Sequence, residues 1–304
     1  MTEFIGFPRP DGSAGIRNHV LLLGLDEASV NVCQKVGGLV KESLLVLSRT
    51  GDSRVLSDVA RHPNAAGSVV VGEGLKGQDK ESLVSDLERW GKPLGVIDMG
   101  GLDFMEAISK ATQTAMDIVQ DVSTHRRALV RLSKLSPVLF HTHDDWTTAV
   151  FVGFLKRLRE ENGRSLWVGK GTKNQKDMNP EIKKNLAGEV GMGEVPGPDP
   201  GVYRYIGPES DEAILRTVLV SGAQIMAFPS GERGFMANAL IPGLSFSLGR
   251  DLGTDQICDL DLGQKEGKNL SPEDTSLLLF SEILATASGK VTRDELLRDV
   301  LIIG

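Results

Sequence analysis

Cysteine is scarce in this chain, which has two in 304 residues. Cys33 and Cys258 can form at most one bridge, so a disulfide framework is excluded and a cytoplasmic location is expected. Two thiols also cannot supply an all-cysteine zinc or iron–sulfur site within one chain. Stability must therefore come from a packed core.

Long apolar runs and an excess of positive charge are also missing. No run approaches the roughly 20 residues that a membrane helix needs. The first residues lack a basic and apolar signal segment. A formal net charge of −7 argues against general binding to nucleic acid or to an anionic membrane. We therefore expect neither nucleic acid nor membrane as a partner.

The composition, 40% hydrophobic and 25% charged, is typical of a globular protein with one large or two ordinary domains. Apolar runs alternate with segments of helical periodicity. This alternation predicts an α/β fold of two Rossmann-like parallel-sheet layers or domains with helices on both faces. The expected strands are residues 19–25, 44–47, 68–71, 93–97, 138–140, 166–168, 224–228 and 244–247. The expected helices are residues 27–40, 79–90, 104–132, 209–220 and 272–287, with another ending near 159.

Residues 169–200 are rich in Gly, Pro, Lys and Asn and show no sustained period, which predicts a linker or lid. The expected domains are then an amino-terminal α/β domain over 1–168 and a carboxy-terminal one over 201–304. Ligands of parallel sheets bind at the carboxyl ends of strands. The loops expected there are residues 26–29, 48–53, 72–77, 98–103 and 141–146.

The most distinctive stretch is Gly6–Asn18, whose glycines and prolines predict a tight, shaped loop outside helix and strand. It carries Arg9, Asp11, Arg17 and Asn18 directly before an apolar strand. Two arginines on a rigid loop can clamp a carboxylate or a phosphate. The alternative is a charged loop whose arginines pair with surface acids.

Histidines mark two further candidates. His141 and His143 point to the same side if their strand continues, and with Asp145 they could hold a divalent metal. Otherwise one histidine or an aspartate caps the following helix. His62 could act as a general base, because the unperturbed pKa of histidine lies near the operating pH, or it caps a helix before Pro63.

The opening Gly-aromatic-x-Arg-x-Asp-Gly-x-x-Gly-x-Arg-Asn resembles the start of the catalytic region of the altronate/galactarate dehydratase family. That family includes the large subunit of sulfolactate sulfo-lyase. Further resemblances follow in family order at 61–64 with 68–74, at 200–231 and at 287–295. The chain thus resembles a shortened, diverged member of this family.

The resemblance also locates departures from the family pattern. Residues 140–145 stand where members carry Glu-Cys-Gly-Gly-Ser-Asp, so Asp145 matches the aspartate and His141 replaces the cysteine. Two other cysteine segments are replaced by 48–53 and 74–76. A small amino-terminal domain, fused in some members and a separate subunit in others, is missing. A small accessory subunit is therefore an expected partner.

The resemblance implies a lyase of the dehydratase type that eliminates water or another β-leaving group from a sugar-acid-like hydroxy acid with metal assistance. The metal would be iron, manganese or magnesium, and no nucleotide cofactor is expected. The residues expected to bind the small carboxylate substrate are Arg9, Asp11, Arg17, Asn18, Asn64 and Arg233. The expected catalytic residues are His62, His143 and Asp145. The expected metal ligands are His141, His143 and Asp145.

Two other functions stay open. A family member that has lost its chemistry would act as a binding or partner subunit, which the replaced cysteine segments favour. A metal-dependent hydrolase could be built on His-x-His-Asp-Asp. A homodimer is the expected assembly on base rates.

Overall fold

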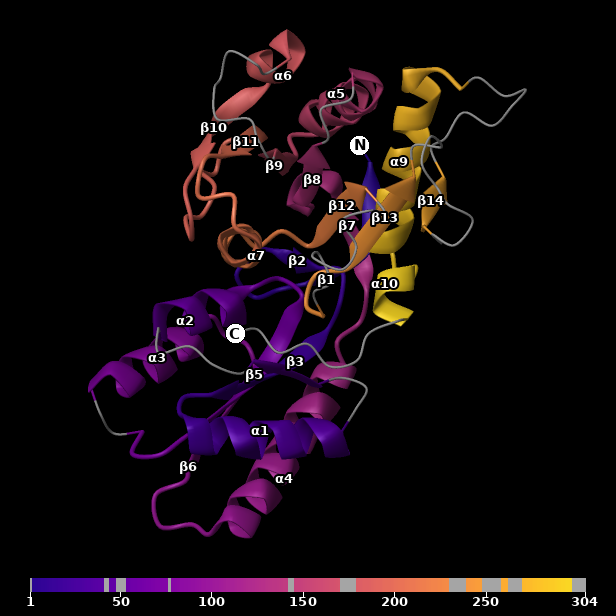
Figure 1. The fold of residues 1–304 in the computed structure, drawn as a ribbon. Coiled ribbons are helices and arrows are strands. Elements are labelled where there is room, and N and C mark those ends of the chain that lie inside the picture. Colours follow the sequence, from indigo (N-terminus) through magenta and orange to yellow (C-terminus); the bar gives the residue numbers. More distant parts are fainter. Residues whose placement is uncertain are drawn as a thin grey trace. The chain divides into compact units, whose positions relative to one another are not determined.

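The computed structural model describes residues 2–40, 44–47, 53–75, 78–141, 145–169, 179–229, 239–247, 258–261 and 270–296 (Figure 1). The chain divides into two compact units. The described residues of the amino-terminal unit lie within 6–128, and those of the carboxy-terminal unit lie within 2–5 and 129–296. Both contain a parallel sheet with helices, so the expected α/β class with two sheets is confirmed.

The amino-terminal unit has a four-stranded parallel sheet in the order β4-β3-β5-β6. Helices α1 and α4 pack together, as do α2 and α3, and the two pairs cover opposite faces (Figure 1). The strands are β3 (His19–Gly24), β4 (Leu44–Leu47), β5 (Ala65–Gly72) and β6 (Leu94–Asp98). The helices are α1 (Glu27–Leu39), α2 (Ser53–Arg61), α3 (Gln78–Arg89) and α4 (Phe104–Ser123).

Burial in this unit explains why its strands could be predicted from apolar runs in the sequence. Every residue of β5 is buried, as are Val20–Gly24 of β3, because helices cover both faces. Helix α4 turns small residues toward the sheet. Its buried positions are Ala107, Ala111, Ala115, Ile118 and Val122. These alanines let the helix lie close to β5 and β6, which it contacts.

Two expectations are corrected in this part of the chain. The helix expected over 104–132 ends at Ser123, where the N–H groups of Thr124 and His125 bond to carbonyls one turn back. A polar run follows, and then strand β7 (Ala128–Arg131). The stretch Gly6–Asn18 also contains strand residues, because β1 (Glu3–Pro8) pairs antiparallel with β2 (Ala14–Gly15).

The carboxy-terminal unit has a seven-stranded parallel sheet in the order β10-β11-β9-β8-β12-β13-β14. Its strands are β8 (Pro137–His141), β9 (Arg164–Gly169), β10 (Leu186–Val190), β11 (Gly201–Tyr205), β12 (Ile225–Pro229), β13 (Gly243–Ser247) and β14 (Leu260–Asp261). Its helices are a 3₁₀ turn at Leu132–Lys134, α5 (Asp145–Glu160), α6 (Pro180–Lys184), α7 (Asp211–Val220), α9 (Pro272–Ala287) and α10 (Arg293–Leu296). Helices α5 and α9 pack closely, since a Cβ on Gly153 would lie 2.7 Å from Ser276 Oγ.

The division at residue 128 differs from the domain boundary expected between 168 and 200. Strand β8 pairs with both β9 and β12, which binds 137–169 to the carboxy-terminal sheet. Within the expected linker, α6 and β10 are ordered elements too short to show a period. Among the described helices, none has the length and apolarity that crossing a membrane requires.

Cys33 lies on the buried face of α1 and is fully covered. Burial, together with the charge of Asp26, raises the pKa of its thiol to about 12. We expect native protein to show at most one thiol reactive toward Ellman's reagent at pH 8, and both after unfolding in urea. A Cys33→Ser variant should leave the native count unchanged. Two fast-reacting thiols in the folded protein would contradict this packing.

Candidate functional site

The opening hairpin is closed by local hydrogen bonds. Arg9 N donates to Ser13 O, and Gly12, at φ +78°, donates to Arg9 O. Asp11 Oδ1 accepts both the N–H and the hydroxyl of Ser13. Partial burial raises the pKa of Asp11, but the Ser13 bonds and the charges of Lys92 and Arg61 outweigh it and lower that pKa overall. The hairpin tip therefore carries an ionised carboxylate.

Arg9 ties this hairpin to the sheet. Its side chain is buried, and Nε donates to Pro63 O at 2.7 Å. Nη1 donates to Asn18 Oδ1 at 2.9 Å and Nη2 to Arg17 O at 2.8 Å. Burial lowers the pKa of Arg9 to about 10 against the opposing effect of Asp11, so the guanidinium stays charged at neutral pH. Arg9 thus connects the segments before β3 and β5.

Asn64 and His62 complete that connection. Asn64 is fully buried, and its Oδ1 accepts the N–H groups of Ile16 at 2.9 Å and Arg17 at 3.4 Å. The Asn64 N–H donates to Nδ1 of His62, which is 1% exposed. A neutral His62 then carries its proton on Nε2. Acting as a base would require His62 to give up its bond to Asn64.

Six sequence-predicted residues thus come together in the amino-terminal unit. Arg17 Nη1 donates to Ile16 O, and Asn18 Nδ2 donates to Val122 O, which fixes both beside Arg9. All precede strand β3 or β5, so they lie at the amino ends of the parallel strands. The six are Arg9, Asp11, Arg17, Asn18, His62 and Asn64. The remaining substrate-binding candidate, Arg233, lies outside the described residues.

Lys92 belongs to this group and was not predicted. Its Nζ donates to the carbonyls of Ala60, Arg61 and His62 at 3.1, 2.9 and 2.8 Å, which caps the end of α2. Burial and the charge of Arg9 lower the pKa of Lys92 to about 7. Its only sequence signal is a place in the Gly-Lys-Pro turn before an apolar run.

Trp90 was also missed, and Arg61 was noted only as part of the 61–64 segment. The guanidinium carbon of Arg61 lies 4.5 Å from the Trp90 ring centroid. Arg127 lies at the same distance over Phe7 and donates to Ile16 O. We call the following set the amino-edge cluster: Arg9, Asp11, Arg17, Asn18, Arg61, His62, Asn64, Trp90, Lys92 and Arg127. It concentrates cations in a chain whose net charge is −7.

The carboxyl ends of the same strands look different. Asp26 caps α1 through Ser29 and also accepts the N–H of Glu73. Asp98 Oδ1 accepts the N–H groups of Gly74 and Gly100. Three expected ligand loops, 26–29, 72–77 and 98–103, begin at this edge. Asp26 and Asp98 each already accept a backbone N–H of the loop 72–77.

The expected metal ligands fall in the carboxy-terminal unit. His141 ends β8, but its side chain is not described, and residues 142–144, including His143, lie outside the described part. Asp145 is exposed and begins α5. Across the described residues, no three His, Cys, Asp or Glu side chains are placed to hold a metal. The His141, His143 and Asp145 site stays a prediction.

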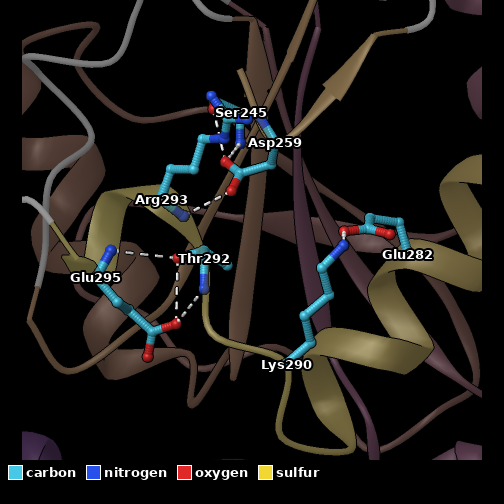
Figure 2. A network of polar contacts seen from close by, with 7 residues as sticks. All are labelled: Ser245, Asp259, Glu282, Lys290, Thr292, Arg293 and Glu295. Atoms are coloured by element: carbon cyan, nitrogen blue, oxygen red, sulfur yellow. Dashed lines mark hydrogen bonds and ion pairs between the residues drawn. The ribbon is translucent and has the colours of Figure 1, made fainter. Parts of the chain in front are cut away.

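The stretch 287–295, which resembles the family ending, forms a network of polar contacts (Figure 2). Asp259 Oδ2 accepts the N–H and hydroxyl of Ser245 on β13, while Oδ1 accepts the N–H of Arg293. Glu295 accepts from the N–H and hydroxyl of Thr292. Lys290 pairs with Glu282 of α9. These bonds anchor α10 to the sheet, which is a structural role.

A cavity of about 290 Å³ opens at the end of β11 in the same unit, lined by Gly169 and residues 204–209. Arg204 is 4% exposed and pairs with Glu189 of β10 at 3.6 Å. Tyr205 donates to Pro208 O at 2.7 Å and fixes the loop. Glu209 also lines this cavity, so it carries both charge signs.

Two solved structures are similar to most of the chain at low sequence identity. A family 9 glycosyl transferase from Veillonella parvula is 8% identical, with a TM-score of 0.34, covering 91% of this chain and 98% of that one. The apo D-lactate dehydrogenase from Escherichia coli is 9% identical, with a TM-score of 0.22, covering 78% and 76%. Neither similarity bears on function.

Sequence comparisons point to the amino-terminal unit. A curated relative, (2R)-sulfolactate sulfo-lyase subunit beta of Chromohalobacter salexigens, is 27% identical over 144 residues. The match covers 43% of this chain and 36% of the relative, so this chain spans about a third of that protein's length. The family model for D-galactarate dehydratase/altronate hydrolase, second domain, matches residues 6–123. The resemblance drawn from the sequence is thereby confirmed: residues 6–123 are similar to the second domain of D-galactarate dehydratase and altronate hydrolase.

Proposed function

We propose that the protein is a lyase of the dehydratase type, eliminating water or another β-leaving group from a small sugar-acid-like hydroxy acid. The observation that carries this proposal is the amino-edge cluster, most of which lies within the family-matched residues 6–123. Its arginines and lysine gather positive charge in an acidic chain. A small carboxylate is the natural complement of such a group.

Elimination beside a carboxylate requires an acidified α-proton and a stabilised enolate-like transition state. Fixed cations placed where negative charge develops supply that stabilisation without reorganisation. Arg9 is held in place by three hydrogen bonds and stays charged at neutral pH. We assign to Arg9, Arg17 and Asn18 the task of shaping this positive field around the acid.

Two nitrogen bases at this edge are candidates to take the α-proton. His62 is the base expected from the sequence, and Lys92 is the second, because its lowered pKa of about 7 provides neutral amine near neutral pH. If Lys92 is the base, the rate should rise with pH and level off above about 7. Turnover by His62→Gln and Lys92→Gln proteins, measured across pH, distinguishes the two candidates. Removing the residue that acts as the base should lower the rate at least about 100-fold.

A metal at His141, His143 and Asp145 remains part of the proposal, and no step is routed through it. When bound, a divalent ion there would supply Lewis-acid chemistry. Elemental analysis of purified protein tests its presence independently of activity.

The proposed activity is tested with a panel of aldonic, aldaric and sulfo-hydroxy acids, each with iron, manganese or magnesium added. We expect release of a keto acid from at least one of them. A heat-denatured sample is the blank. No turnover across the panel, with metal content near zero, would contradict an enzymatic role.

The second candidate function is a binding or partner subunit, and the relative's name as a subunit favours it. Thermal-shift measurements separate the two functions. An enzyme should be stabilised by an acid only with metal present, whereas a binder should be stabilised regardless of metal. Adding a small subunit of the kind expected from the family to the assay would test for an accessory partner.

A further inference from the structure

Arg61 differs from the other arginines of the amino-edge cluster. Arg9, Arg17 and Arg127 each donate to backbone carbonyls of the hairpin region. Among the described residues, the guanidinium of exposed Arg61 makes no hydrogen bond or ion pair, and it stacks on the Trp90 ring. Its five N–H donors are therefore not used by protein acceptors in the described part of the chain, and an anion could bind them.

Trp90 holds that guanidinium in a defined place. The ring lies 4.5 Å from the Arg61 guanidinium carbon. Trp90 is followed by Gly91 at φ +64°, where an added Cβ would come 3.4 Å from Pro10 of the hairpin. This packing joins the Trp90 turn to the hairpin, so the stacked guanidinium loses little freedom when it binds a planar, two-oxygen group.

Positive charges close to Arg61 strengthen its attraction for an anion. Lys92 donates to the carbonyl of Arg61 itself, and Arg9 lies near enough to Lys92 to affect its ionisation. Asp11, on the hairpin tip, uses Oδ1 for Ser13, and among the described residues its Oδ2 has no partner. Lys92 and Arg61 both act on the Asp11 carboxylate. The cation and the open acceptor oxygen lie on adjoining segments, because Gly91, next to Trp90, lies beside Pro10, next to Asp11.

We propose that Arg61, stacked on Trp90, binds the carboxylate of a small hydroxy acid and that Asp11 Oδ2 accepts its hydroxyl. Carboxylate recognition by the paired N–H groups of Arg61 supplies affinity. The Asp11 acceptor supplies selectivity, since it repels an acid that brings no hydroxyl donor. Arg9 and Lys92 are positioning residues for this site. The identity of the ligand as a hydroxy acid rests on the proposed function.

Three six-carbon probes separate these contributions by isothermal titration of the full-length protein. Galactarate has two carboxylates and four hydroxyls, galactitol has no carboxylate, and adipate has no hydroxyl. We expect galactarate to bind most tightly, galactitol not at all and adipate weakly. Added salt should weaken galactarate binding because Arg61 is exposed. Inorganic phosphate should bind more weakly than galactarate.

Variants then assign the contacts. Arg61→Gln should weaken galactarate at least about tenfold, the loss of one charge-assisted bidentate contact. Trp90→Leu should weaken it less, and Asp11→Asn should lower the ratio of galactarate to adipate affinity. The matched control is Arg89→Gln, because Arg89 is an exposed arginine on α3 that pairs with Asp86. Circular dichroism of each variant confirms folding.

The proposal is overturned if Arg61→Gln binds galactarate as wild type does, if galactitol or phosphate binds as tightly, or if wild type binds no probe. Its failure is distinguishable from that of the proposed function. Galactarate binding lost in Arg61→Gln without turnover of any acid supports this site and contradicts the lyase. Turnover that is unchanged in Arg61→Gln supports the lyase and contradicts this site.

Discussion

Replacing Gly15 with alanine is expected to lower the free energy of unfolding by about 3 kcal/mol. An added Cβ would lie 2.2 Å from Pro63 O and 2.6 Å from Arg9 Nη2. One is a backbone atom, and the other is held by a hydrogen bond to Arg17 O. The methyl group therefore fits only if the hairpin moves away and the Arg9 bonds break. Urea unfolding followed by circular dichroism measures the change.

Gly38→Ala is the matched control for that substitution. Gly38 lies inside α1, and no atom lies within 4 Å of its added Cβ. Because alanine favours helix over glycine, this variant should gain about 0.5–1 kcal/mol. A Gly15→Ala protein as stable as wild type would show that the hairpin does not dock as described.

Replacing Arg9 with methionine is expected to cost about 3 kcal/mol of stability. The substitution keeps an unbranched, flexible side chain but leaves Pro63 O and Arg17 O buried without their donor. Removing one partner of a buried charged contact is destabilising even though burying the charge is itself costly. Arg9→Lys should recover only part, since an ammonium cannot reach three acceptors in the fork geometry. Urea unfolding at pH 7 measures both.

Arg89→Met provides the surface comparison for Arg9. Its side chain is 75% exposed, so its ion pair with Asp86 contributes little. We expect a change within about 0.5 kcal/mol. Equal stability of the Arg9 and Arg89 variants would mean that Arg9 is not the tie between hairpin and sheet.

Much of the fold could be predicted from local sequence patterns. Strands β3 and β5 are buried on both faces, so they read as apolar runs, and α1 begins at the Asp26 capping box. The pattern failed for short elements: β1 and β2 contain the glycines and prolines that predicted a loop, and β10 lacks a period. The unit boundary at residue 128 was not readable, because strand pairing between β8 and β12 joins distant sequence.

The candidate site was also predictable only in part, where its residues are adjacent in sequence. Arg9, Arg17 and Asn18 are adjacent in sequence and were identified together. Arg61 and Lys92 are far apart, and only the parallel alignment of β5 beside β6 brings the residues before those strands together. Sequence spacing also could not show that Arg9 uses its donors on backbone carbonyls. The sequence motifs thus identified the region before β3 and β5 as the candidate site. Only the packed structure shows which contact each side chain makes there.

The Trp90 indole signal in a ¹H–¹⁵N spectrum, assigned with a Trp90→Phe variant, reports most directly on whether an acid binds beside Arg61. Nε1 of Trp90 is buried without a hydrogen-bond partner among the described residues, and its ring lies under the Arg61 guanidinium. During titration with galactarate this signal should shift saturably, while that of buried Trp167 stays in place. Galactitol should leave both unchanged. An unmoved Trp90 signal at saturating galactarate, or an equal shift with galactitol, would contradict an acid-binding amino edge.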